Sequence, residues 1–200
     1  MKTVAIIPAR LHSTRFPKKI LYLIDEKPMV VHVYENAKKS EIIDDVFVAV
    51  DDDETIKELK KWKVKTIMTG VDHVSGTDRI YEASKTINAD IIVNVQADEP
   101  FIDHSLIDLI VKEFDDESIE IVTAAGKSLN AKQLNDYNTV KVMLDSDRFA
   151  TTFRRDPIEV EAGGYYHHSG IYAYRKDILE KFTSLGQSIN EKEFKLEQFR

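Results

Sequence analysis

The segment PARLHSTRFPKK, residues 8–19, carries four cationic side chains and no acidic one. The cations are Arg10, Arg15, Lys18 and Lys19. Like charges on one loop repel one another, and an anionic ligand would relieve that repulsion. Arginine matches phosphate oxygens two at a time, and lysine adds a movable positive charge. The segment therefore indicates an anion-binding loop, with a solvated basic loop as the alternative.

A second segment, NVQADEP, carries two adjacent carboxylates, Asp98 and Glu99. Both segments follow apolar stretches that predict buried strands, Met1–Ile7 and Asp90–Gln96. Because ligands of open parallel sheets bind at the carboxyl ends of the strands, we expect the two loops to converge on one edge. The carboxylates could simply balance the charge of the basic loop. Since Mg²⁺ takes one or two carboxylates and fills its shell from phosphate and water, the pairing favours a nucleotide site with a metal.

A third segment, DHVSGTDR, ends at Arg79. Ser75 or Thr77 can cap a helix here, which places Arg79 in the first turn. The helix dipole disfavours a cation at that position, so an anion or a base-edge acceptor nearby would compensate. The alternative is an exposed Arg79 that pairs with Asp78 or Glu82.

Two standard nucleotide fingerprints are absent from the sequence. No Gly-x-Gly-x-x-Gly occurs, and the basic loop contains no glycine. Gly126-Lys127-Ser128 resembles the end of a P-loop, but the glycine required five positions earlier is Ile121, so we expect an ordinary turn. There is no cysteine, which excludes disulfides, thiolate nucleophiles and zinc–thiolate sites.

Apolar stretches alternate along the chain with segments of helical periodicity. The remaining expected strands are Val46–Val50, Lys65–Met68, Glu120–Ala124, Thr139–Leu144 and Tyr165–Tyr174. The expected helices are a segment opened by Pro28, Glu54–Trp62, Thr77–Ile87, and one capped by Asp103 with Leu106, Leu109, Ile110 and Phe114 inside. This alternation predicts an α/β fold with a mostly parallel, twisted sheet covered by helices on both faces.

We expect a single α/β domain over residues 1–200, with a smaller β-rich lobe over residues 155–185 for the substrate or a second copy. His167 and His168 lie in this lobe, and adjacent strand residues point to opposite faces, so at most one of them reaches a given site. The sequence stops in EKEFKLEQFR, a helical pattern with no cap, which favours a C-terminally truncated chain.

The bulk composition is that of an ordinary globular protein. The 200 residues are 42% hydrophobic and 32% charged, with a formal net charge of −7. An acidic chain does not bind a nucleic acid backbone readily, so the basic loop favours a small anion. The first apolar run is too short for a signal peptide, and no segment approaches the roughly 18 apolar residues of a membrane span. We therefore expect a cytoplasmic protein.

Five segments together resemble a known family. PARLHSTRFPKKIL, VSGTDR, VNVQADEP, HHSGIYAYR and LEQ are similar in order and spacing to the motifs of the CMP-Kdo synthetases, the 3-deoxy-manno-octulosonate cytidylyltransferases, from residue 4 to residue 200. The resemblance implies a nucleotide-diphospho-sugar transferase-like fold, a homodimer and an Mg²⁺ cofactor. It implies that CTP activates an acidic eight-carbon sugar, Kdo, giving CMP-Kdo and pyrophosphate for lipopolysaccharide biosynthesis.

The resemblance also assigns roles to residues of the nucleotide half. Arg10, Ser13, Arg15 and Lys19 would bind the triphosphate. Lys18 stands where the family usually has glycine, so no role is transferred to it. Arg10, Arg15 and Lys19 form the expected catalytic set together with Asp98, which would hold Mg²⁺, and Arg79 would lie beside the nucleotide.

The residues that the resemblance assigns to the sugar are Gln96, Arg155, His168, Tyr172, Glu197 and Gln198. The match of Arg155 is approximate, because Arg154 is adjacent and the surrounding TTFRRDPI differs from the usual pattern. The family carries a second metal-binding aspartate after the Glu-Gln segment, beyond the end of this sequence.

Two alternatives remain. The surroundings of Arg155 leave open another acidic sugar, such as 8-amino-Kdo or a relative of sialic acid. The missing second aspartate leaves open a non-catalytic nucleotide-binding protein.

Overall fold

The computed structural model describes residues 1–11, 16–159 and 164–200. Within these ranges the chain forms two compact units. Unit 1 comprises Met1–Val122 and Ile171–Ser184, and unit 2 comprises Thr123–Gly170 and Leu185–Arg200. The lobe expected over residues 155–185 thus includes residues of both units.

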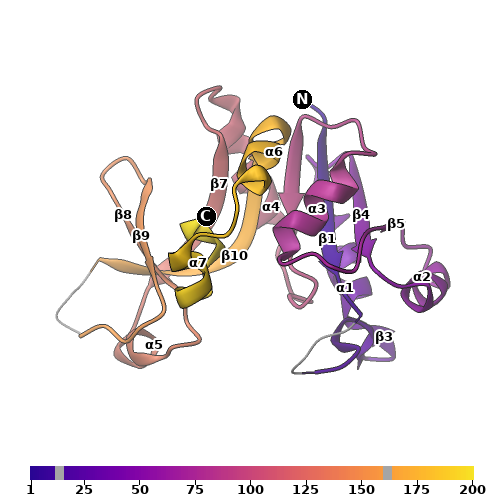
Figure 1. The fold of residues 1–200 in the computed structure, drawn as a ribbon, viewed down its shortest axis with the longest axis horizontal. Coiled ribbons are helices and arrows are strands. Elements are labelled where there is room, and N and C mark those ends of the chain that lie inside the picture. Colours follow the sequence, from indigo (N-terminus) through magenta and orange to yellow (C-terminus); the bar gives the residue numbers. More distant parts are fainter. Residues whose placement is uncertain (12–15, 160–163) are drawn as a thin grey trace. The chain divides into compact units, whose positions relative to one another are not determined.

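Unit 1 is built on a mostly parallel sheet (Figure 1). Its strands lie in the order β5 (Thr66–Met68), β4 (Asp45–Val50), β1 (Thr3–Ala9), β6 (Ile91–Asn94) and the end of β10 (Tyr165–Arg175). Neighbouring pairs among β5, β4, β1 and β6 are parallel, and β10 runs antiparallel to β6. In β1, six of the seven residues are buried, which matches a continuous apolar strand covered on both faces.

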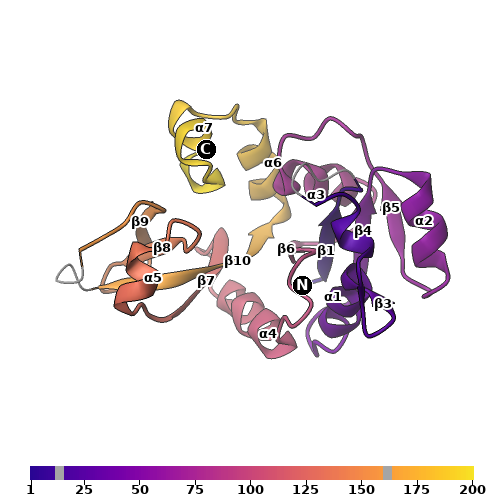
Figure 2. The same ribbon diagram turned by 90° about the horizontal axis from the view of Figure 1, so that it is seen from below.

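Helices cover both faces of this sheet. The helices of unit 1 are α1 (Met29–Ala37), α2 (Asp53–Lys60), α3 (Gly76–Ser84), α4 (His104–Lys112) and α6 (Lys176–Ser184). Figure 2 shows α3 and α6 on one face and α1 and α4 on the other. The predicted fold class is confirmed, because the strand–helix alternation of the sequence produces this layered arrangement.

Shorter elements complete unit 1. They are η1 (Lys19–Leu21), β2 (Leu23–Ile24), β3 (Lys27–Pro28) and η2 (Glu113–Asp115). Trp62, the one tryptophan of the sequence, follows α2, and Nζ of Lys27 lies 5.9 Å from its ring centroid.

The core of unit 1 joins the sheet to α3 and α6. Val4, Ile6 and Ile92 from the strands pack against Ile80 of α3 and Leu179 of α6. Each such fully buried side chain contributes about 1.5–3 kcal/mol to stability. This packing fixes the carboxyl ends of the strands, where the loops of interest begin.

Unit 2 has its own small core, formed by Leu134, Ile158 and Tyr165. Its elements are most of β7 (Ile121–Ser128), α5 (Ala131–Asn135), β8 (Lys141–Leu144), β9 (Ala150–Arg154), the start of β10, α7 (Ile189–Phe194) and η3 (Glu197–Phe199). β8 pairs antiparallel with β9 and with β10, and β7 pairs with β10. In the part of the chain that the structure describes, no helix is long and apolar enough to span a membrane.

Two local predictions are wrong. The Gly126-Lys127-Ser128 segment is the end of strand β7 and not a turn. In α4 the buried side chains are Ile107, Ile110 and Val111, whereas Leu109, predicted to face the core, is 59% exposed.

Candidate functional site

The basic loop leaves the carboxyl end of β1. Arg10 is exposed, and Leu11 after it is buried. The backbone carbonyl of Leu11 accepts a hydrogen bond from the amide of Lys18 at 3.2 Å, so the chain closes on itself at this point. Residues Ser13 and Arg15 lie outside the described residues, and their assignment to the triphosphate remains a prediction.

The basic loop meets the acidic loop, as the sequence predicts. Nζ of Lys19 lies 2.6 Å from Oδ2 of Asp98, and both side chains are substantially exposed. Exposed pairs of this kind contribute less than about 1 kcal/mol. An incoming anion and its metal ion could therefore replace this pairing at little cost. The convergence of the two loops on one edge of the sheet is confirmed.

Lys18 has the left-handed backbone conformation, with φ 55° and ψ 27°. Glycine adopts this conformation without steric cost, whereas a residue with a Cβ does not. The side chain of Lys18 pairs with Glu54 of α2 at 2.5 Å. The ammonium group of Lys18 is therefore paired with an acidic side chain of unit 1.

The acidic loop offers a single exposed carboxylate to a metal ion. Glu99, next to Asp98, is partly buried; burial and then the charge of Asp98 raise its pKa. Among the described residues, no group of three His, Cys, Asp or Glu side chains could hold a metal ion. Mg²⁺ does not require such a group, because substrate phosphates and water complete its shell. Asp98 beside a cationic loop fits an ion that binds together with a triphosphate.

Arg79 is buried on α3 and lies against the carboxyl end of β4. Its Nη2 lies 3.0 Å from Oδ2 of Asp51, the residue that follows β4. The helix begins after Ser75, whose side chain accepts a hydrogen bond from the amide of Asp78. The alternative in which Arg79 is exposed and pairs with Asp78 or Glu82 is wrong, since the compensating anion is Asp51.

Gln96 and Tyr172 lie near one another in unit 1. Nε2 of Gln96 lies 3.4 Å from Oδ1 of Asn94, and Asn94 pairs with Tyr172 across β6 and β10. The ring of Tyr172 stacks on Tyr174 with centroids 5.9 Å apart. Both predicted sugar residues thus lie at the carboxyl end of β6, the edge that also bears Asp98.

His168 is buried in unit 2, whereas His167 is exposed, as expected for adjacent strand residues. Nε2 of His168 lies 2.9 Å from Oγ1 of Thr123, and its ring meets the edge of Phe153. Burial, and then the positive charges of His167 and Arg155, lower the pKa of His168 to about 4. The imidazole is therefore neutral at neutral pH and can both donate and accept a hydrogen bond.

Arg155 follows β9 and is fixed through its backbone. Its carbonyl accepts a hydrogen bond from Nζ of Lys141 at 2.7 Å, and the carbonyl of Asp136 accepts another at 2.6 Å. Within residues 1–11, 16–159 and 164–200, the buried Nε of Arg155 has no hydrogen-bond partner. An unpaired buried donor is costly, so a ligand oxygen at this atom would be favourable.

Lys141 is a residue that sequence reasoning missed. It is fully buried, and burial lowers its pKa. The available signal was a single lysine inside the apolar stretch TVKVML. Its ammonium group joins the backbone carbonyl of Asp136 to that of Arg155.

Glu197 and Gln198 lie in η3 and not in a continuous helix. α7 ends at Phe194, and Lys195 takes the left-handed conformation with φ 53°. The turn that follows is held by a buried ion pair in which Nη2 of Arg200 lies 2.8 Å from Oε1 of Glu191. The predicted uncapped helix at the end of the sequence is therefore wrong.

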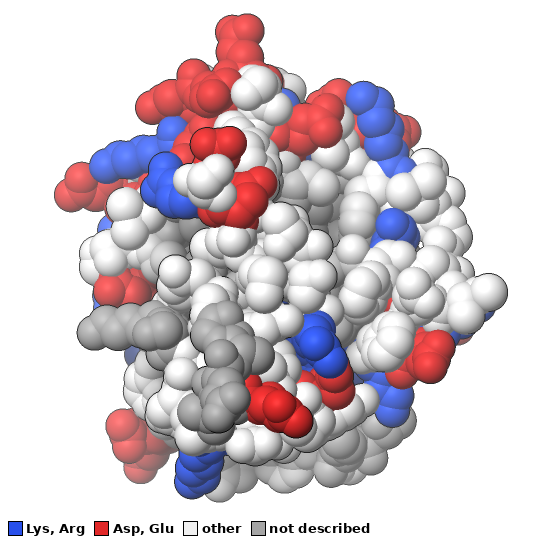
Figure 3. Space-filling view, turned by 90° about the vertical axis from the view of Figure 1, so that its left-hand side faces the viewer, with Lys and Arg blue, Asp and Glu red and all other residues white. Residues whose placement is uncertain are grey.

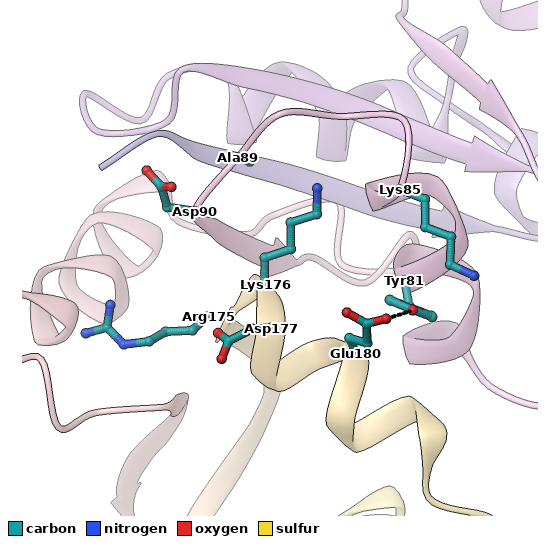
Figure 4. A pocket seen from close by; sticks show the side chains of 8 residues that line it. All are labelled: Tyr81, Lys85, Ala89, Asp90, Arg175, Lys176, Asp177 and Glu180. Carbon is teal, nitrogen blue, oxygen red and sulfur yellow. Dashed lines mark hydrogen bonds between the residues drawn. The ribbon is translucent and has the colours of Figure 1, made fainter.

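Unit 1 also contains a charged depression of about 710 Å³ (Figure 4). It lies at the opposite edge of the sheet, where Asp90 precedes β6. Several of its polar groups are already paired: Tyr81 donates to Glu180, Lys176 donates to the carbonyl of Ile87, and Asp90 accepts from the amide of Lys2. It contains none of the predicted site residues.

Comparison with known proteins gives the same assignment as the motifs. A family model described as cytidylyltransferase matches residues 4–200. The 3-deoxy-manno-octulosonate cytidylyltransferase of Chloroherpeton thalassium is 39% identical over 208 residues, covering 100% of this chain and 85% of the relative. The enzyme of that name from Phocaeicola vulgatus is 40% identical over 215 residues, covering 100% and 84%.

A solved structure gives the same result. CMP:2-keto-3-deoxy-manno-octonic acid synthetase complexed with CTP superposes with a TM-score of 0.93 at 37% identity, covering 99% of this chain and 84% of the other. The chain therefore belongs to the cytidylyltransferase family, in the branch of the CMP-Kdo synthetases that its motifs resemble.

Proposed function

We propose that this chain transfers the cytidylyl group of CTP to 3-deoxy-manno-octulosonate, giving CMP-Kdo and pyrophosphate for lipopolysaccharide biosynthesis. The observation that carries the proposal is the contact between Lys19 and Asp98, which brings the cationic loop and an exposed carboxylate to one edge of the sheet. The names of the relatives and of the similar solved structure support the same substrates.

The reaction needs positioning and charge neutralisation. The anomeric hydroxyl oxygen of the sugar attacks the α-phosphorus of CTP, and the bond from this phosphorus to the oxygen bridging to the β-phosphate breaks. Pyrophosphate leaves, and the hydroxyl proton passes to water. Arg10, Arg15 and Lys19 neutralise the triphosphate and the leaving group, with Ser13 as a further donor to the phosphates. No protein nucleophile is required.

We assign Mg²⁺ to Asp98, because this carboxylate is exposed beside a cationic loop and the described residues offer no larger carboxylate group there. When bound, the ion would neutralise phosphate charge and lower the pKa of the attacking hydroxyl.

We propose that the acidic sugar is bound by the residues that the motif resemblance assigns to it. In unit 2 the unpaired Nε of Arg155 suits a carboxylate oxygen, and neutral His168 can exchange hydrogen bonds with sugar hydroxyls. The resemblance also implies Gln96, Tyr172, Glu197 and Gln198 as sugar residues. Kdo and 8-amino-Kdo share the carboxylate, so turnover rates measured side by side decide between them.

The decisive test is pyrophosphate release by the purified protein with CTP, Mg²⁺ and Kdo. We expect release from the native protein, loss of at least 100-fold in Asp98→Asn, and native rates in Asp115→Asn, an exposed carboxylate elsewhere in unit 1. A folded native protein that binds CTP without any turnover would favour the non-catalytic alternative.

We further propose a homodimer that acts in the cytoplasm, where CTP is available. Unit 2 exposes the large apolar side chains of Tyr137, Phe149 and Tyr166, which a second copy could cover. Figure 3 shows broad uncharged areas between scattered charges on the side of the molecule where β8 and β9 lie. Light scattering coupled to size exclusion measures the mass; a mass of about 23 kDa at every concentration would reject the dimer.

A further inference from the structure

Asp51 and Arg79 form a buried ion pair at the carboxyl edge of the sheet in unit 1. Their side chains are 8% and 3% exposed, and the contacting atoms lie 3.0 Å apart. Burial lowers the pKa of Arg79, and the charge of Asp51 opposes that effect. Each charge thus needs the other, since removing one partner leaves an uncompensated buried charge.

The second oxygen of Asp51 holds the basic loop. Oδ1 of Asp51 accepts a hydrogen bond from the amide of Leu11 at 2.9 Å. The carbonyl of Leu11 accepts from the amide of Lys18 at 3.2 Å. Both polar backbone groups of Leu11 are therefore held, and we call Leu11 and Lys18 the neck of the loop.

Arg79 in turn is fixed by the strand ends beside it. Its Nη1 donates to Oγ1 of Thr69 at 2.7 Å and to the carbonyl of Gly70 at 3.1 Å. Thr69 donates to the carbonyl of Val50, the last residue of β4, at 2.8 Å. The guanidinium thus ties the ends of β4 and β5 to the carboxylate that holds the neck.

A close backbone approach supports the same segment from α3. A Cβ added to Gly76, the first residue of α3, would lie 3.2 Å from Cγ of Pro8. Pro8 belongs to the end of β1, just before the neck. The glycine of the VSGTDR motif therefore allows the helix to pack against the origin of the basic loop.

We infer that Asp51 and Arg79 are positioning residues that hold the neck of the basic loop in the geometry that binds the triphosphate. The inference rests on the proposed function, in which this loop meets the phosphates of CTP. Arg79 acts through Asp51 and Leu11, so its effect on the nucleotide is indirect. Asp51, which the motif comparison leaves without a role, becomes as important as Arg79.

The test compares dissociation constants for CTP and for inorganic triphosphate, measured with Mg²⁺ and without sugar by titration calorimetry. We expect Asp51→Asn, Asp51→Ala and Arg79→Met to weaken both ligands by a similar factor, roughly 10- to 100-fold, because the misplaced loop serves the phosphates. We expect Asp51→Ala to bind both ligands more weakly than Asp51→Asn, because asparagine can still accept the hydrogen bond from the amide of Leu11. The double variant Asp51→Asn/Arg79→Met should bind both ligands no more weakly than the single variant with the lower affinity, because the two residues act through one contact.

The matched control is Glu191→Gln, which breaks the buried Glu191–Arg200 pair of unit 2. We expect it to lose stability as the Asp51 variants do and to bind CTP with native affinity. Circular dichroism verifies that each variant is folded. If the other variants do not fold, the affinities of Asp51→Asn, the smallest change, decide the test. The KM for the sugar in Asp51→Asn should stay within about twofold of native.

The outcomes separate the two proposals. A native protein that binds neither ligand overturns the proposed function. If the native protein binds both ligands and folded Asp51→Asn binds them with the same affinity, the positioning role of Asp51 and Arg79 is overturned. Weakening of CTP alone by Arg79→Met, with native triphosphate binding, also overturns it, because Arg79 would then contact the nucleoside itself.

Discussion

Lys18 lies in the left-handed region, where a residue with a Cβ is destabilised by about 1–2 kcal/mol relative to its usual conformations. We predict that Lys18→Gly is more stable than Lys18→Ala by about 1 kcal/mol, because glycine adopts this φ freely. Both variants remove the exposed pair with Glu54, so that contact cancels in the comparison. Urea unfolding measures both free energies; an alanine variant as stable as the glycine variant would contradict the strain.

His168 makes stability depend on pH. The unfolded histidine has a pKa near 6.5, whereas in the folded chain burial, assisted by two neighbouring cations, lowers it to about 4. As pH falls from 6.5 to 4, the unfolded chain takes up a proton that the folded chain refuses, so the free energy of unfolding decreases. The two pKa values correspond to roughly 3 kcal/mol at most.

His168→Gln isolates this contribution from that of the carboxylates. Glutamine can keep a hydrogen bond to Thr123 and does not titrate. We predict that the stability advantage of native protein over variant shrinks steadily between pH 6.5 and 4 in urea unfolding. A constant difference across that range would mean that His168 is solvated and titrates normally.

At the scale of the elements, two variants of α4 test which face of this helix is buried. Ile107 is 0% exposed and Leu109 is 59% exposed. We predict that Ile107→Ala lowers the free energy of unfolding by about 2–5 kcal/mol, whereas Leu109→Gln changes it by less than about 0.5 kcal/mol. Thermal or urea unfolding of the two variants measures this. A larger loss of stability in Leu109→Gln than in Ile107→Ala would mean that Leu109 faces the core, as the sequence predicted.

The error at α4 has a simple physical origin. In LIDLIV, residues 106–111, only Asp108 is polar, so several helical faces are equally apolar and periodicity cannot choose between them. The long strands were predictable because runs of β-branched residues bounded by polar loops strongly favour strands over helices. β9, ATTFR, was missed because its two adjacent threonines give little apolar signal.

For the whole molecule, the net charge of −7 opposes an anionic ligand except where the basic loop gathers positive charge. We predict that CTP with Mg²⁺ at 100 times its dissociation constant stabilises the folded chain by about 2.7 kcal/mol. For a chain of this length that raises Tm by roughly 5–10 °C. Differential scanning fluorimetry measures the shift, with UTP as the control; equal shifts for CTP and UTP would argue against cytidine selectivity.

The meeting of Lys19 with Asp98 was predictable because parallel strands bring their carboxyl ends to one edge. The ion pair of Asp51 and Arg79 was not predictable, because the two residues are 28 positions apart and meet only through the placement of α3 beside the ends of β4 and β5. Lys141 and the Glu191–Arg200 pair were missed for a related reason. A charged residue in a local sequence pattern predicts an exposed position, and only the folded structure shows that such a residue has a buried partner.

The position of Trp62 gives the chain a built-in optical probe. The indole lies in unit 1, near the ammonium of Lys27, and unit 2 contains tyrosines and phenylalanines but no tryptophan. Fluorescence excited at the red edge of protein absorbance therefore reports the melting of unit 1 alone, whereas far-ultraviolet dichroism follows both units. Superimposable curves from the two signals would establish that the molecule loses its structure in a single cooperative step.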